Sequence, residues 1–129
     1  MRAGLLAIVL SVTWMANDEV RADDNCQIQR FNFNITSAGP WPARMTVKAG
    51  KSCGSRRWSF GTITPSRLYL ADQARHGKVT LSYPGGYQYS PAAGYVGADS
   101  FTLRLCGTKN GGYQGCANIR FDVSVIAQP

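Results

Sequence analysis

The feature that most constrains the fold is a two-residue alternation of apolar and polar side chains near the C-terminus. Residues 101–106 place Phe101, Leu103 and Leu105 on one side, and residues 119–126 alternate in the same way. Successive side chains of a β-strand point to opposite faces, so this period predicts strands with one buried and one solvated face. No window of ten or more residues shows an apolar stripe with helical spacing. We therefore expect an all-β protein.

Further short runs with strand character follow one another along the chain, separated by turns that contain glycine or proline. The expected strands are residues 27–35, 44–48, 58–63, 68–70, 78–83, 87–89, 101–106 and 119–126. Breaks are expected at 38–42, 49–51 and 84–86, with a loop over 91–97 and a hairpin loop over 107–115. Seven to eight short strands with this spacing predict a sandwich of two antiparallel sheets.

The N-terminal segment has the composition of an export sequence. Arg2 precedes an apolar run over residues 3–15, and residues 20–22 (Val-Arg-Ala) provide a signal-peptidase site. This predicts a signal peptide over residues 1–22 and a secreted or periplasmic protein of residues 23–129, long enough for a single domain. An uncleaved N-terminal anchor is the alternative, which the shortness of the apolar run disfavours. No membrane span is expected after residue 22.

Four cysteines follow this segment: Cys26, Cys53, Cys106 and Cys116. An even number of cysteines in an exported chain indicates disulfides, whereas a zinc site would need closely spaced ligand pairs. Cys106 ends one expected strand and Cys116 begins the next, and adjacent ends of an antiparallel pair lie within bonding reach. Cys26 then pairs with Cys53. Because these cysteines lie at strand ends and in loops, we expect peripheral staples and not a bridge between the sheets.

Residues 75–125 resemble a bacterial immunoglobulin-like or cadherin-like domain. The segments that carry the resemblance read HGKV, YQYSP and GYVGADSF, with His76, Gly77, Tyr89, Pro91, Gly97, Asp99 and Phe101 as their characteristic residues. Ala74 stands where the family has a proline. The resemblance implies an immunoglobulin-like sandwich, a scaffold that serves binding or spacing, so the function has to be found in a site on it.

The same residues have a structural interpretation. Gly77 and Gly97 are expected to take positive φ at tight corners, and Pro91 is expected to end a strand. Asp99 lies at a corner between loop and strand, where its carboxylate is expected to accept backbone N–H groups of the preceding loop. Tyr89 and Phe101 are expected to fill the core.

Groups suited to catalysis are scarce. His76 is the only histidine, and the acids after residue 22 are Asp23, Asp24, Asp72, Asp99 and Asp122. A general base at His76, a carboxylate pair of Asp72 with Asp99, and a calcium site at Asp99 are the alternatives to a structural role. Calcium sites need several oxygen ligands, and Asp99 stands alone in the sequence. We expect a non-catalytic protein with no cofactor and no metal.

The chain carries a formal net charge of +7, and its cations cluster within residues 48–58. The cluster comprises Lys48, Lys51, Arg56 and Arg57, with Trp58 beside them. If exposed, it would attract nucleic acid, lipopolysaccharide, acidic polysaccharide or an anionic membrane, and the alternative is a solvated loop. No nucleic-acid-binding motif accompanies it, so specific nucleic-acid binding is not expected.

Four tyrosines offer a second type of surface. A sugar-stacking surface of Tyr83, Tyr87, Tyr95 and Tyr113 is one interpretation, and half-buried packing within the strands is the other.

Taken together, the sequence predicts a secreted, non-catalytic immunoglobulin-like module that binds a protein or envelope component or has a structural role at the cell surface. The alternative is a polyanion-binding protein that uses residues 48–58.

Overall fold

The computed structural model describes residues 25–56, 62–82 and 85–128, so the expected signal peptide lies outside the described residues. The described chain forms eight strands and contains no α-helix, which confirms the all-β prediction. The strands are β1 (Cys26–Ile28), β2 (Trp41–Lys48), β3 (Cys53–Ser55), β4 (Ile63–Asp72), β5 (Gly77–Ser82), β6 (Gly86–Pro91), β7 (Gly97–Lys109) and β8 (Tyr113–Ile126).

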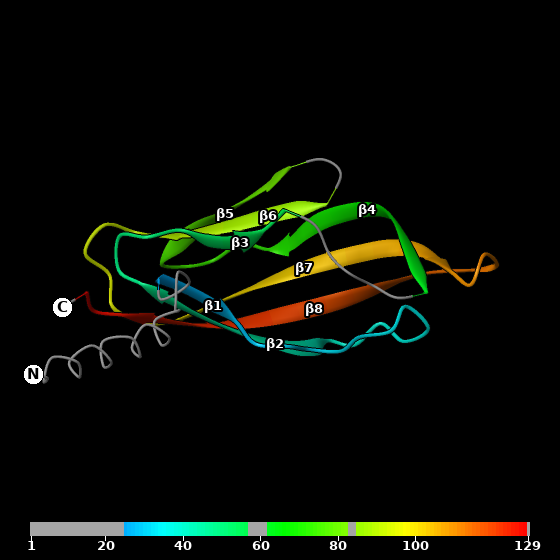
Figure 1. The fold of residues 1–129 in the computed structure, drawn as a ribbon, viewed down its shortest axis with the longest axis horizontal. Helices are drawn as coiled ribbons and strands as arrows, with labels where there is room; N and C mark the ends of the chain where they lie inside the picture. The colour runs from blue at the N-terminus through cyan, green and yellow to red at the C-terminus, as the bar shows by residue number, and fades with distance from the viewer. Residues whose placement is uncertain (1–24, 57–61, 83–84, 129) are drawn as a thin grey trace, which may run out of the picture.

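The strands form the two sheets of a sandwich (Figure 1). The larger sheet has five strands in the order β1-β2-β8-β7-β4, and the smaller has three in the order β3-β6-β5. Strands β7 and β8 form a long antiparallel hairpin in the larger sheet. Contrary to a purely antiparallel arrangement, β2 pairs with β8 in parallel. Parallel strands need a long connection, and the smaller sheet lies within the connection from β2 to β8.

The core lies between the sheets and is built from the predicted alternation. Phe101, Leu103 and Leu105 of β7 are buried, as are the facing positions of β8. The Phe101 ring stacks on Phe121 with centroids 4.7 Å apart, and Tyr89 of the smaller sheet stacks on Phe101 at 5.8 Å. Each such side chain contributes about 1.5–3 kcal/mol through burial. Tyr89 and Phe101 therefore fill the core as expected.

Both predicted disulfides are present. Cys106 and Cys116 lie opposite each other in the β7–β8 ladder, and Cys26 is bonded to Cys53. The prediction that both are peripheral staples is wrong for Cys26–Cys53, because Cys26 belongs to the larger sheet and Cys53 to the smaller. Cys53 is buried, so this disulfide joins the two layers of the sandwich.

The strand expected over residues 27–35 ends at Ile28, and β2 begins at Trp41 inside the expected break. Gln29 N donates to Arg44 O at 3.0 Å, so Arg44 directs its backbone groups toward β1. Backbone direction alternates from one residue of a strand to the next, so Pro42, two residues before Arg44, also directs its backbone groups toward β1. Proline has no N–H to donate, and the ladder therefore stops.

Two other boundaries differ from the prediction. β3 was not expected, and the hairpin loop over 107–115 is reduced to a turn at residues 110–112, where Asn110 and Gly111 have φ of 50° and 75°. Gly107 lies within β7 because a Cβ atom there would be 2.5 Å from the carbonyl oxygen of Thr64. Glycine is needed at position 107 for close strand pairing, and it does not mark a loop there. Most of the expected strand over 58–63 lies outside the described residues, and β4 begins at Ile63.

Candidate functional site

The described part of the basic segment 48–58 is divided between the two sheets. Lys48 ends β2 opposite Ile126 in the larger sheet, and Lys51 follows in a turn in which its N–H donates to Lys48 O. Arg56 follows β3, in the smaller sheet. Arg57 and Trp58 lie outside the described residues. Lys48 and Lys51 therefore lie together at one turn, whereas Arg56 lines a hollow beside the smaller sheet.

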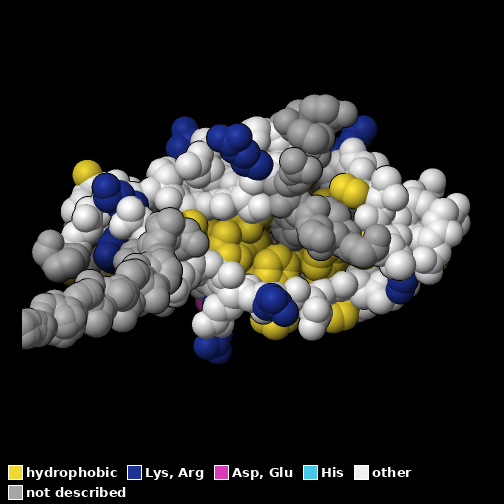
Figure 2. Space-filling model, viewed as in Figure 1, with side chains coloured by type: hydrophobic (Ala, Val, Ile, Leu, Met, Phe, Trp, Pro, Cys, Tyr) yellow, Lys and Arg dark blue, Asp and Glu magenta, His cyan; other side chains and the backbone are white. Residues whose placement is uncertain are grey.

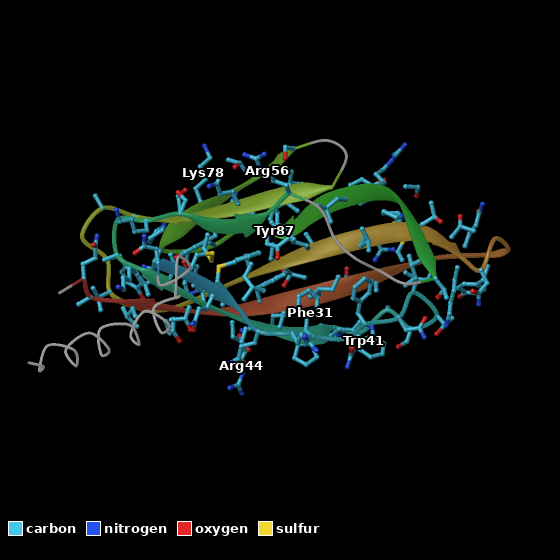
Figure 3. All side chains as sticks on the ribbon, viewed as in Figure 1. Phe31, Trp41, Arg44, Arg56, Lys78 and Tyr87 are labelled. Carbon is cyan, nitrogen blue, oxygen red and sulfur yellow. A yellow bond between two sulfur atoms is a disulfide. The ribbon has the colours of Figure 1, made fainter. Side chains whose placement is uncertain are left out.

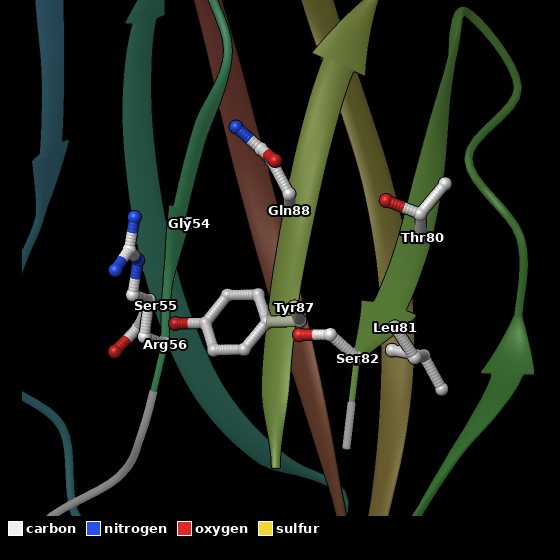
Figure 4. Close-up of a pocket in the computed structure, with 8 residues that line it drawn as sticks. All are labelled: Gly54, Ser55, Arg56, Thr80, Leu81, Ser82, Tyr87 and Gln88. Carbon is white, nitrogen blue, oxygen red and sulfur yellow. The ribbon is translucent and has the colours of Figure 1, made fainter. Parts of the chain in front are cut away.

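Arg56 lines a hollow of about 300 Å³ on the outer face of the smaller sheet (Figure 4). Gln88 of β6 pairs with Gly54 of β3 and with Thr80 of β5, so these three positions share one face. In Figure 4, Gln88 stands between Arg56 on the β3 side and the β5 residues on the other. We call this feature the Arg56 hollow; its lining is Gly54, Ser55, Arg56, Thr80, Leu81, Ser82, Tyr87 and Gln88.

Glycines leave this face without bulky side chains. A Cβ atom on Gly54 would lie 2.0 Å from the carbonyl oxygen of Tyr87, so only glycine permits β3 to approach β6 in this way. A Cβ atom on Gly86 would lie 2.5 Å from Ser82 Oγ. The sheet surface is therefore bare backbone at these points, and the polar side chains around it border a depression.

The Arg56 hollow is positively charged. Among the residues that the structure describes, its lining includes Arg56 and no acidic residue. Lys78 lies one row further along the same face, opposite Ser90, whose Oγ is 2.9 Å from Ser52 Oγ. Figure 3 shows Arg56 and Lys78 on the same side of the molecule, with Arg44 on the other side. Neither Arg56 nor Lys78 forms an ion pair with any described residue, so both cations are available to an anion.

The chain as a whole has a formal net charge of the same sign, +7. Figure 2 shows Lys and Arg side chains around the visible face and scarcely any acidic side chain. An arginine bordered by hydroxyl and amide groups can bind a carboxylate or sulfate through charge-assisted hydrogen bonds, while the neutral groups bind hydroxyls. The chemistry of the Arg56 hollow is thus that of an anion site with additional polar contacts.

The tyrosines do not form one sugar-stacking surface. Tyr87 is buried against Phe121, with ring centroids 5.2 Å apart, and burial raises its pKa. Tyr95 stacks on His76 at 4.3 Å, and Tyr113 lies half-exposed in the β7–β8 hairpin. Tyr83 lies outside the described residues. The interpretation as one sugar-stacking surface is therefore wrong for the three described tyrosines, which the fold places in different environments. The other interpretation, packing of tyrosines within the strands, holds for Tyr87.

Asp99 organises a structural network. Its carboxylate accepts hydrogen bonds from Tyr89 Oη at 2.8 Å and from the backbone N–H groups of Ser100, Arg75 and His76 at 2.9–3.1 Å. Burial by itself raises the pKa of Asp99, but these hydrogen bonds outweigh it and lower the pKa below its ordinary value. Backbone donors were expected from the preceding loop; two of them instead come from the turn before β5.

The rest of the sequence motif supports this network. Pro91 ends β6 opposite Gly77, and Gly97 has φ of 140°, as expected. The expectation of positive φ at Gly77 is wrong. Gly77 lies in a strand, and a Cβ atom there would be 2.5 Å from Ser90 O and 2.9 Å from the Tyr89 ring. Its glycine is needed for close approach. His76 contributes its backbone N–H to Asp99 and its ring to Tyr95.

A second group of cations, not noted in the sequence, lies on the outer face of the larger sheet. Arg67 Nη1 donates to Tyr69 Oη at 3.0 Å, and its guanidinium lies 5.8 Å from the centre of the Tyr69 ring. Tyr69 is paired with Arg104, so the two side chains share a face. We call Arg67, Tyr69 and Arg104 the arginine cluster. The alternation could have revealed part of it, because Arg104 lies between two core leucines and must point outward.

A groove of about 500 Å³ follows the edge of β2, lined by residues 29–32 and 41–44. Trp41 borders it, and its indole Nε1 donates to Ser37 O at 3.0 Å. Pro42 on this edge lacks the N–H that an added strand would need, which disfavours recognition of an extended peptide here.

The described part of the chain holds no group of three or more His, Cys, Asp or Glu residues placed to bind a metal. It also holds no helix of the length and apolarity needed to span a membrane. The sequence matches no protein-family model and no curated protein. Function therefore has to be inferred from the chemistry of the surface.

Proposed function

We propose that this protein is a secreted, non-catalytic immunoglobulin-like module that binds acidic polysaccharide. The observation that carries the proposal is the Arg56 hollow, where a cation with no acidic neighbour in the described lining is bordered by hydroxyl and amide groups. The two-sheet sandwich and the motif over residues 75–125 support the immunoglobulin-like assignment. The export sequence over residues 1–22 supports secretion.

The choice of polysaccharide rests on the neutral groups of the hollow. Arg56 and Lys78 alone would attract any polyanion, because the interaction of exposed cations with a charged chain depends mainly on counterion release. Thr80, Ser82 and Gln88 add donors and acceptors that sugar hydroxyls can satisfy. A nucleic-acid site would instead be expected to offer exposed aromatic rings for base stacking, and the one aromatic residue among the described lining residues, Tyr87, is buried.

Heparin affinity tests this proposal, with the exported protein on a heparin column and neutral dextran as the reference matrix. We expect salt-dependent retention on heparin and none on dextran. The Arg56→Gln/Lys78→Gln variant should elute at lower salt, with its log–log salt slope reduced by about 2, one for each charge removed. Arg30→Gln/Arg75→Gln, which removes two exposed charges elsewhere, is the matched control.

Two results would contradict the proposal. A double variant that elutes with the control shows that the Arg56 hollow does not bind the polymer. If the protein is retained on duplex DNA as strongly as on heparin, at matched charge density, it recognises only charge. That result would remove the argument for a polysaccharide. Circular dichroism of each variant checks that the sandwich is intact.

A further inference from the structure

We propose that the arginine cluster is a second polysaccharide-binding face, so that one molecule cross-links two acidic chains. This inference rests on the proposed function, since it assigns the same class of ligand to the other side of the sandwich. The inference goes beyond the proposed function because it predicts cross-linking, an activity that a single binding site cannot have.

The arginine cluster has the composition of a binding face. The Arg67 guanidinium is held by Tyr69, through the 3.0 Å hydrogen bond and its position over the ring. Tyr69 is 41% exposed, which leaves part of the ring free to stack on a sugar. Arg104 reaches Asn118 Oδ1 at 3.4 Å, and this contact is with a neutral group. Two cations and an aromatic ring are thus pre-positioned on adjacent strands.

The charges of the cluster are not neutralised by described carboxylates. Among the described residues the one ion pair is Arg120 with Asp122, 3.2 Å apart and more than half exposed. It lies on the same face, further along the sheet, where Arg120 pairs with Thr102. Arg67 and Arg104 have no such partner in the described chain, so an anionic ligand would supply the missing charge.

The two faces point in opposite directions. Tyr69 and Arg104 project from the outer side of the larger sheet, while Leu68, Leu70 and Leu105 face the core. Gln88 and Thr80 project from the outer side of the smaller sheet, while Val79 and Tyr89 face the core. The sheets of a sandwich are about 10 Å apart, so two polymer chains can lie on the two faces without contact.

Bivalency requires no oligomer in this arrangement. One domain that binds a chain on each face brings two chains together, and many domains along the chains add further links. A protein with only the Arg56 hollow would coat a polymer without joining it to another. The difference between coating and joining is measurable.

Heparin-coated beads of two colours provide the test. The wild-type protein, shown to be monomeric by light scattering, should produce two-colour aggregates that disperse again when excess protein saturates every chain. Arg67→Gln/Arg104→Gln and Arg56→Gln/Lys78→Gln should each coat the beads and lose aggregation. The Arg30→Gln/Arg75→Gln control should aggregate them like the wild type.

The outcomes separate the two proposals. Absence of coating by the wild type overturns the proposed function, whereas coating without aggregation overturns only cross-linking. Aggregation by the Arg67→Gln/Arg104→Gln variant at wild-type level also overturns cross-linking through this face. Because Arg104 is partly buried, the single change Arg67→Glu on exposed Arg67 repeats the test if the double variant melts early; it too should abolish aggregation.

Discussion

The hydroxyl of Tyr89 donates a hydrogen bond to the carboxylate of Asp99, 2.8 Å away, and joins the core of the smaller sheet to the start of β7. Tyr89 is fully buried, so its hydroxyl needs a hydrogen-bond partner within the protein, and Asp99 provides one. The same carboxylate holds the turn at Arg75 and His76. Asp99 therefore stabilises a junction between the two sheets, and its expected role is structural.

Asp99→Ala should lower the free energy of unfolding by about 1–3 kcal/mol, because the substitution leaves Tyr89 and three backbone donors without their acceptor. Urea unfolding followed by tyrosine and tryptophan fluorescence measures the change. Asp122→Ala is the control, since its exposed ion pair with Arg120 contributes at most about 1 kcal/mol. A loss at Asp99 no larger than that at Asp122 would contradict the network.

The stability that Asp99 contributes should depend on pH. Its pKa in the folded protein lies below the ordinary value of 3.8, so the folded state favours the ionised form. This contribution is present above 3.8 and is lost as the pH falls through the lower, folded-state pKa. The difference in unfolding free energy between wild type and Asp99→Asn should therefore shrink on acidification, in urea titrations between pH 6 and pH 2. A constant difference would show that Asp99 is not ionised in the network.

The two disulfides should differ in their contribution to stability. Cys26–Cys53 closes a longer loop, with a sequence separation of 27 against 10 for Cys106–Cys116. Restriction of the unfolded chain then predicts losses of about 3.6 and about 2.7 kcal/mol when each pair is replaced by serine. Thermal and urea unfolding of the two double-serine variants compare them directly. A larger loss for the Cys106–Cys116 pair would show that loop closure does not dominate.

Gly54→Ala should both destabilise the protein and weaken heparin retention. A methyl group at Gly54 would lie 2.0 Å from the carbonyl oxygen of Tyr87, so β3 has to move away from β6, at a cost of about 1–3 kcal/mol. That shift would also displace Arg56, which directly follows β3. Gly112→Ala is the control, because nothing lies within 4 Å of a Cβ atom there. Equal stability of the two variants would contradict the close approach of β3 to β6.

Much of the fold could be predicted from local patterns. The alternation that identifies β7 and β8 arises from the backbone geometry of a strand, which fixes a two-residue period wherever the strand lies. The Cys106–Cys116 bond follows from the hairpin that these neighbouring strands form. The basic character of the surface is likewise a matter of composition. These features depend on residues that are close in the chain.

The tertiary structure decided what depends on partners distant in the chain. Pro42 ends the β1 ladder only because it faces β1, and the Cys26–Cys53 bond joins the layers only because β1 and β3 belong to different sheets. Arg67 and Arg104 share a surface only because β4 lies beside β7. Strand order and register are set by the burial of many side chains at once, and no local pattern encodes which strands become neighbours.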